Sequence, residues 1–130
     1  IEIRSMDTCG WDCLCAGPAF FIGLLYGNLE ELFDIVKRWN KNEIISAYKD
    51  SPKKGLNTIL ENKSILDWSK ELFRLAKKGL ENRNELNSKK QNEVKFLSHI
   101  KTIIDTNSTN AEEIMTKYLK NKNFFSVHEK

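Results

Sequence analysis

The sequence contains few of the residues that interrupt helices, and no hydrophobic run long enough to cross a membrane. Among its 130 residues there are two prolines and six glycines. The most apolar stretch, around Phe20, reaches about half of the roughly 20 residues that span a bilayer, and Gly17, Pro18 and Gly23 interrupt it. No basic leader precedes it, so we expect neither a signal peptide nor a membrane segment.

The chain also lacks a strong excess of charge of one sign. It carries 21 Lys and Arg residues against 18 Asp and Glu, a formal net charge of +3. The lysine pairs at residues 53–54, 77–78 and 89–90 alternate with acidic residues, so they build no basic stripe along which a nucleic acid could bind. We therefore expect no nucleic-acid partner.

Cysteine is too scarce for a secreted disulfide framework. Cys9, Cys13 and Cys15 are odd in number and clustered. Cys13 and Cys15 would point to different sides of a helix, and neither His99 nor His128 is near them in the sequence. We expect no metal site here, and we interpret the cysteines as buried thiols in a reducing, cytoplasmic setting. His99 lies among core positions, which favours a structural role.

What is present is the composition of a soluble globular domain, with 40% hydrophobic and 30% charged residues. Residues 14–26 leave no polar face, which predicts a buried central helix. Residues 29–39 repeat apolar side chains at helical spacing, which predicts an amphipathic helix. A shorter helix over residues 42–48 should end at Ser51-Pro52, and we expect residues 55–63 to form a loop.

Two capping patterns divide the second half of the chain. Ser64, with Asp67 three residues later, predicts a helix that continues to about Arg83. Thr109, with Glu112 three residues later, predicts another helix through residue 119. Between them we expect a polar loop at residues 84–92 and a helix at residues 93–105. The predicted fold class is all-α, with about six helices around the central helix at residues 14–26 and one short strand at the N-terminus.

That strand carries the acid and base of a possible site. In Glu2-Ile3-Arg4-Ser5-Met6-Asp7, Glu2 and Arg4 are two residues apart, so in an extended segment both project from one face. By spacing alone, E-x-R-x-x-D is more often a surface ion pair than a site. The chain opens at Ile1 with no initiator Met, so we expect a segment to precede it and the strand to find its partners elsewhere.

Together with the residues that follow it, the motif resembles the C-terminal part of glutamate-cysteine ligase, the γ-glutamylcysteine synthetase of plants and many proteobacteria. After E-x-R-x-x-D come Trp11, then L-C-A-G-P-A-F at residues 14–20 and G-L-L-Y at residues 23–26. Weaker matches follow in the family's order at residues 66–80, 93–97 and 109–112. The likeness covers nearly the whole chain.

The resemblance implies an enzyme whose catalytic half is similar to glutamine synthetase, with a sheet that holds ATP, Mg²⁺ and glutamate. By that likeness, Glu2 would be a metal ligand, Arg4 would be a catalytic residue facing the transferred phosphate or the glutamate, and Asp7 would shape the turn. A carboxylate oxygen suits Mg²⁺, and a guanidinium group suits an acyl phosphate. The implied reaction is phosphorylation of glutamate's γ-carboxyl group by ATP, followed by attack of cysteine's amine, in glutathione biosynthesis.

The chain departs from the family's pattern in two respects. Where family members carry Gly-Gly-Pro before the Trp and a basic pair after it, this chain has Thr8-Cys9-Gly10 and Asp12-Cys13. The bulk of the catalytic sheet is also outside these 130 residues. We therefore expect a C-terminal fragment, with a catalytic-strand remnant at residues 1–7, a helical domain at residues 8–120 and a tail at residues 121–130.

Such a fragment should be inactive alone and should not bind ATP or Mg²⁺ tightly. The expected partners are glutamate and cysteine in the intact enzyme, the missing catalytic half, and a second copy in a homodimer, because an unpaired strand and uncovered apolar surface favour association. The alternative is a noncatalytic helical protein-interaction domain of ligase ancestry.

Overall fold

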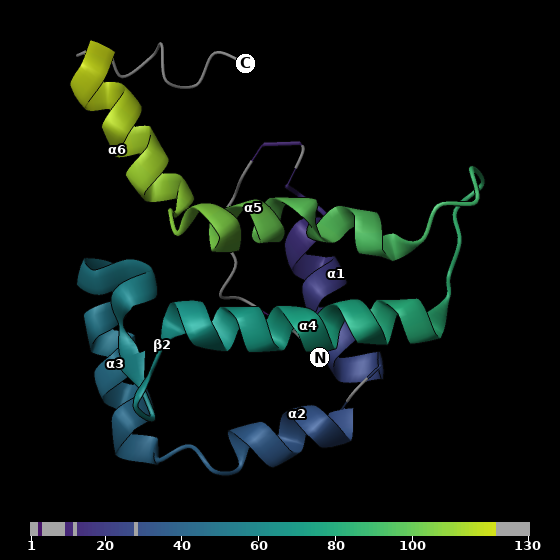
Figure 1. The fold of residues 1–130 in the computed structure, drawn as a ribbon, viewed down its shortest axis with the longest axis horizontal. Helices are drawn as coiled ribbons and strands as arrows, with labels where there is room; N and C mark the ends of the chain where they lie inside the picture. Colours follow the sequence, from purple (N-terminus) through teal and green to yellow (C-terminus); the bar gives the residue numbers. More distant parts are fainter. Residues whose placement is uncertain (1–2, 4–9, 12, 28, 122–130) are drawn as a thin grey trace.

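A computed structural model describes residues 3, 10–11, 13–27 and 29–121, and within these residues the fold is all-α, as predicted (Figure 1). The described α-helices are α1 (Ala16–Ile22), α2 (Leu29–Val36), α3 (Lys41–Lys54), α4 (Ile65–Arg83), α5 (Ser98–Thr106) and α6 (Asn110–Asn121). The shorter described elements are a π-helical turn η1 (Gly23–Gly27), the 3-10 turns η2 (Gly55–Asn57) and η3 (Glu93–Leu97), and the strands β1 (Ile59–Leu60) and β2 (Lys63–Ser64).

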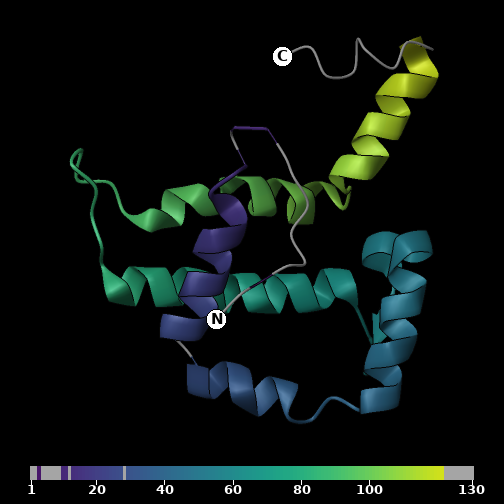
Figure 2. The same ribbon diagram turned by 180° about the vertical axis from the view of Figure 1, so that it is seen from behind.

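The centre of the fold is α4. In Figures 1 and 2, α5 lies along one side of α4, α2 lies along the other, and α1 crosses it. Leu75 and Leu80 of α4 are 0% exposed, whereas Leu14 and Tyr26, at the ends of the predicted central helix, are 54% and 70% exposed. The prediction of a central helix at residues 14–26 is therefore wrong. Its apolar residues form the short α1 and η1, whose buried residues are Ala16, Ala19, Gly23 and Leu24.

Local sequence sets both ends of α4. Ser64 Oγ accepts a hydrogen bond from the backbone N–H of Asp67 at 3.1 Å, which satisfies one of the free donors of the first turn. At the other end, Asn84 adopts the left-handed conformation with φ 51°, which asparagine tolerates better than most residues. The predicted boundaries of this helix are confirmed.

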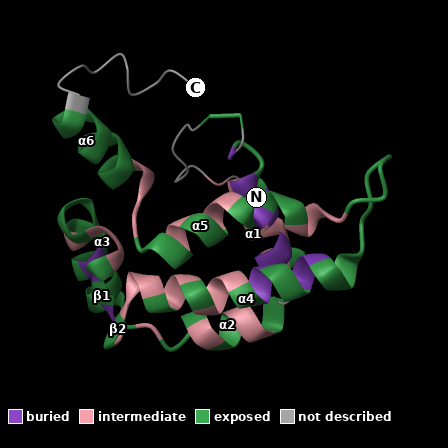
Figure 3. Cartoon of the chain, turned by 45° about the horizontal axis from the view of Figure 1, so that its top comes forward, coloured by how far each residue is buried: buried purple, intermediate pink, exposed green. Residues whose placement is uncertain are grey.

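One hydrophobic cluster joins α1, η1, α4 and η3. Its buried members are Ala19, Leu24, Leu75, Ala76, Leu80 and Leu97. Figure 3 shows buried residues gathered on α4 next to α1. Phe20, Leu72 and Ile100 are only partly buried and pack around this cluster. The core is thus narrow and lies toward the second half of α4.

Pro52 lies inside α3, so the prediction that this helix ends before Pro52 is wrong. A proline lacks the N–H that would bond to the carbonyl four residues earlier, which is that of Tyr48. In this helix the Tyr48 carbonyl accepts a hydrogen bond from Ser51 Oγ at 3.1 Å instead. The helix ends at Lys54, where Gly55 has a positive φ of 52°.

The predicted loop at residues 55–63 contains η2 and a β-hairpin, in which β1 pairs with β2 in antiparallel orientation. Its turn residues, Glu61 and Asn62, have φ values of 49° and 59°, as a type I′ turn requires. Glu61 also ties the hairpin to the start of α3. Its N–H donates to Glu43 Oε2 at 2.8 Å, and its Oε1 accepts from the N–H of Asn40 at 2.5 Å.

The C-terminal helices follow the predicted order. The helix predicted at residues 93–105 is present as η3 followed by α5. α6 opens with the predicted capping box, in which the N–H of Thr109 donates to Glu112 Oε2 at 2.7 Å and the N–H of Glu112 donates to Thr109 Oγ1 at 3.3 Å. In both Figures 1 and 2, α6 projects away from α4, and its large apolar side chains, Ile114, Met115, Tyr118 and Leu119, are 36–67% exposed.

The strand predicted at residues 1–7 lies outside the described residues except for Ile3, which is half-buried and does not lie in a strand. The tail predicted at residues 121–130 is likewise outside them from residue 122 onward.

Candidate functional site

The residues predicted to carry the chemistry, Glu2, Arg4 and Asp7, lie outside the described residues, so their arrangement stays a prediction. The structure does describe the frame to which their segment is joined. This frame consists of the turn at residues 10–15 (residue 12 excepted), α1, η1 and α4, and we call it the N-terminal frame.

The turn of the N-terminal frame is held by backbone hydrogen bonds. The N–H of Cys13 donates to the carbonyl of Gly10 at 3.1 Å, and the N–H of Ala16 donates to the carbonyl of Cys13 at 2.9 Å. Trp11 is 89% exposed. The tryptophan of the family-like motif therefore fills no core position among the described residues, and its ring is exposed at the surface.

The two described cysteines of this turn differ from the prediction of buried thiols. Cys13 is buried, at 6% exposed, but it is disulfide-bonded. Cys15 is a free thiol, but it is exposed. Its position at the start of α1 explains the exposure, because the buried face of that short helix is formed by Ala16 and Ala19. The disulfide removes one premise of the cytoplasmic interpretation, which stays a prediction.

η1 meets α4 at backbone contact distance. A Cβ added at Gly23 would lie 2.2 Å from the Ala76 carbonyl oxygen, and one added at Gly27 would lie 2.0 Å from Gly79 Cα. A Cβ added at Gly79 would lie 1.9 Å from the Gly23 carbonyl oxygen. Real Cβ atoms essentially never approach other atoms within 3.0 Å, so only glycine fits at these three positions. We call this contact the glycine crossing.

The sequence prediction missed the glycine crossing as a feature that positions the site. Gly23 and Gly27 are four residues apart, and Ala76 and Gly79 are three apart. Small residues at these spacings lie on one side of a helix and allow two backbones to approach closely. The signal was thus present in the sequence, but nothing local to it identifies the partner helix.

Charged side chains add a second link, between α2 and α4. Glu31 forms ion pairs with Arg74, from Oε1 to Nη2 at 3.0 Å, and with Lys78, from Oε2 to Nζ at 3.4 Å. The hydrogen bond from Arg74 is the main cause that lowers the pKa of Glu31 below its ordinary value, with a smaller contribution from Lys78. These side chains are 41–60% exposed, so the pairs fix orientation more than they add stability.

His99 has the structural role that the sequence predicts. Its Nε2 lies 3.1 Å from Asn110 Oδ1, a contact that joins α5 to α6. Among the residues that the structure describes, no group of three or more His, Cys, Asp or Glu side chains is arranged to hold a metal ion. Within the same residues, no helix combines the length and the apolar character needed to span a membrane.

Comparison with known proteins identifies the family. The model of glutamate-cysteine ligase family 2 (GCS2) matches residues 1–127. This chain belongs to the glutamate-cysteine ligase family. Over 120 residues, or 91% of the chain, it is 32% identical to the chloroplastic glutamate-cysteine ligase A of Oryza sativa subsp. indica and covers 23% of that protein.

Other ligases give similar values. The chain is 32% identical to the chloroplastic glutamate-cysteine ligase of Solanum lycopersicum and 31% identical to that of Arabidopsis thaliana, in each case over 91% of this chain and 22% of the relative. The chain thus spans less than a quarter of the length of these curated relatives. The family resemblance predicted from the sequence motifs is confirmed.

Proposed function

We propose that this chain is the C-terminal part of an ATP-dependent glutamate-cysteine ligase, which joins the γ-carboxyl group of glutamate to the amine of cysteine in glutathione biosynthesis. The observation that carries the proposal is the family match over residues 1–127, which includes the E-x-R-x-x-D segment. The relatives are named for the ligase activity of far longer chains, so the activity is that of a complete protein.

In the complete enzyme, Arg4 acts on the transferred phosphate. A guanidinium group can form two parallel hydrogen bonds with phosphate oxygens, and a fixed positive charge is worth most where negative charge develops during the reaction. Asp7 shapes the turn that leads from Arg4 to Trp11. The ATP supplies the phosphoryl group that activates the glutamate carboxyl for attack by the amine.

Glu2 furnishes one oxygen ligand for Mg²⁺. A single carboxylate does not make a magnesium site, because this ion keeps its waters until further carboxylates and substrate phosphates replace them. The described residues contain no cluster that could supply the rest. We infer that the remaining ligands and the nucleotide site come from the part of the ligase outside this chain, because the chain spans less than a quarter of the length of its relatives.

The helical domain holds the site segment, which contains Arg4, in a fixed position. The N-terminal frame begins three residues after Asp7, and within it η1 contacts α4 through the glycine crossing. A backbone-to-backbone contact of this kind leaves little freedom for α1 to shift along α4. Since misplacement of a catalytic group by about 1 Å can cost about 10²-fold in rate, a rigid base for Arg4 would be of direct value to the enzyme.

The proposal is tested by turnover of the complete ligase that contains this segment. Arg4→Ala should lower the production of γ-glutamylcysteine by about two orders of magnitude or more, as removal of a group that stabilises developing charge does. Arg38→Ala removes an exposed arginine close to the C-terminal end of α2 and serves as the matched control. Near-normal turnover of Arg4→Ala would contradict the assigned role.

The 130-residue chain alone should make no γ-glutamylcysteine. Holding ATP, glutamate and cysteine together can account for roughly 7 to 11 kcal/mol of barrier lowering, which one segment cannot supply. Measurable turnover by this chain would contradict its description as a part of the active unit. If a complete reading frame contains no acidic metal ligands or nucleotide site upstream, the noncatalytic interaction domain becomes the better hypothesis.

A further inference from the structure

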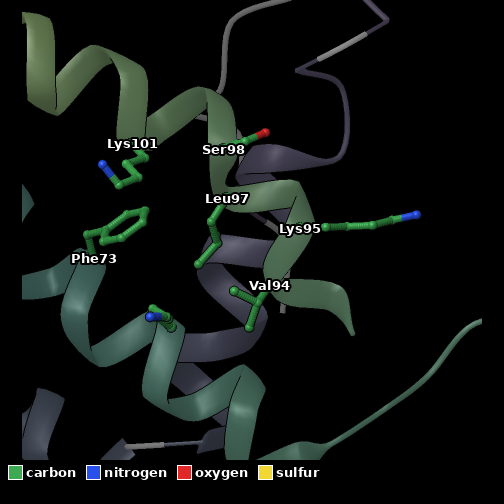
Figure 4. A pocket seen from close by; sticks show the side chains of 7 residues that line it. Phe73, Val94, Lys95, Leu97, Ser98 and Lys101 are labelled. Carbon is green, nitrogen blue, oxygen red and sulfur yellow. The ribbon is translucent and has the colours of Figure 1, made fainter. Parts of the chain in front are cut away.

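A small apolar groove lies between α4 and the segment formed by η3 and α5. Its volume is about 250 Å³, and its lining residues are Phe73, Lys77, Val94, Lys95, Leu97, Ser98 and Lys101. Figure 4 shows Phe73, Val94 and Leu97 pointing toward one another. The groove therefore has an apolar floor, three lysines among its lining residues, and no acidic lining residue.

The three lysines differ in where their charge lies. In Figure 4, Lys101 is on the same side of the groove as Phe73, whereas Lys95 points away from the groove. The ammonium group of Lys95 donates to Gln91 Oε1 at 2.8 Å and lies 4.9 Å from the centre of the Phe96 ring. Lys101 and Lys77 thus remain as the lysines able to turn toward a bound group.

Lys77 and Lys101 each form an ion pair with a surface carboxylate that another carboxylate can replace. Lys77 Nζ lies 3.5 Å from Glu81 Oε1, and Lys101 pairs with Asp105; all four side chains are 49–61% exposed. Neither acid lines the groove. Surface pairs of this kind are weak, so a second carboxylate placed over the groove can compete for the ammonium groups at little cost.

The size of the groove indicates what can fill it. Small-molecule sites usually have volumes of about 300 to 1,000 Å³, and this groove is smaller, so it suits a single large apolar side chain. We propose that the groove docks an acidic peptide segment of a partner protein, with one aromatic side chain against the partly buried Phe73 and Val94 and flanking carboxylates beside Lys77 and Lys101. This inference goes beyond the ligase activity and does not depend on it.

A defined peptide tests the proposal. The probe is acetyl-Glu-Glu-Phe-Glu-Glu-amide, added to the ¹⁵N-labelled protein while amide chemical shifts are recorded. Shifts should concentrate at Phe73, Val94 and Leu97 and saturate in the high micromolar to low millimolar range. Peptides with Ala in place of Phe, or with Lys in place of every Glu, should each bind at least several-fold more weakly.

The charge contribution is tested with matched lysine variants. Lys77→Gln and Lys101→Gln should each weaken binding of the probe by about 1.5- to 5-fold, the range expected for an exposed ion pair. Lys95→Gln should change binding less, because its ammonium group faces away from the groove. Raising the ionic strength from about 0.01 M to about 0.15 M shortens the Debye length from about 30 Å to about 8 Å and should weaken binding further.

Several outcomes would overturn the proposal. These are the absence of shifts around the groove at low millimolar peptide, equal binding of the Ala peptide, and a loss of binding in Lys95→Gln as large as in Lys101→Gln. Phenylacetate that binds as tightly as the peptide would make the groove a small-carboxylate site, which also contradicts docking of a protein. Circular dichroism of each variant shows whether the fold is retained, so a loss of binding can be assigned to the groove.

Discussion

Replacing Gly79 with alanine should force apart two helical segments that touch through their backbones. The new methyl carbon would lie 1.9 Å from the carbonyl oxygen of Gly23, 2.8 Å from its carbonyl carbon and 3.0 Å from Gly27 Cα. Ordinary contact begins at 3.4 Å, so the oxygen and the methyl group must separate by a further 1.5 Å, the difference between 3.4 and 1.9. A backbone carbonyl cannot swing aside as a side chain would.

Two effects of opposite sign set the magnitude. Alanine is favoured over glycine in a helix interior by about 1 kcal/mol, which would stabilise α4. Overpacking of a filled contact costs about 1 to 3 kcal/mol and occasionally more. Because all three close atoms belong to the backbone, we take the upper end of this range and expect a net loss of about 2 kcal/mol in the free energy of unfolding.

The assay is urea unfolding followed by far-ultraviolet circular dichroism. Gly10→Ala is the matched control, because a Cβ added at Gly10 meets nothing within 4 Å, and it should change stability by less than about 0.5 kcal/mol. If Gly79→Ala is as stable as the parent or more stable, helix propensity outweighs the contact. The glycine crossing would then not be a constraint on the frame.

Three further predictions concern the core, a helix cap and association. Leu75→Ala should destabilise the protein by about 2 to 5 kcal/mol because the side chain is 0% exposed, whereas Leu119→Ala, at 67% exposed, should cost less than about 0.5 kcal/mol in the same unfolding assay. The backbone hydrogen bond from Thr109, and then that from its hydroxyl, lowers the pKa of Glu112 below its ordinary value of 4.5. The resulting stability is therefore present above about pH 4.5 and is lost as the pH falls through the lowered pKa. Thermal unfolding at several pH values should show that Glu112→Gln removes this dependence while Glu113→Gln, which leaves the cap intact, does not. Finally, the exposed apolar face of α6 favours self-association, and sedimentation velocity showing a clean monomer at high micromolar concentration would contradict it.

The sequence alone determined the features that depend on near neighbours. The caps at Ser64 and Thr109 formed as predicted because their hydrogen bonds join residues only three apart. The all-α class followed from helical spacing of apolar residues and the scarcity of proline and glycine. The family also followed from the sequence, since the motifs between Glu2 and Tyr26 are a linear pattern that needs no coordinates.

Neither the sequence nor the structure describes the whole candidate site. The sequence motif selects Glu2, Arg4 and Asp7 by resemblance, and these residues lie outside the described part of the chain. The structure adds the frame behind them, with an exposed Trp11 and a buried, disulfide-bonded Cys13. The sequence could not predict the disulfide, because a disulfide requires a specific distance and orientation of two cysteines that their spacing in the sequence does not fix.

The tertiary structure decided which apolar residues form the core. Residues 14–26 are more continuously apolar than α4, yet Leu75 and Leu80 are completely buried while Leu14 and Tyr26 are exposed. Burial depends on which face meets another element, and one face of α4 is buried because α1, η1 and η3 converge on it. The same holds for Gly79, whose need to be glycine arises from a segment more than fifty residues away. The sequence shows which side chains are apolar, but the packing of the helices determines which of these side chains become buried.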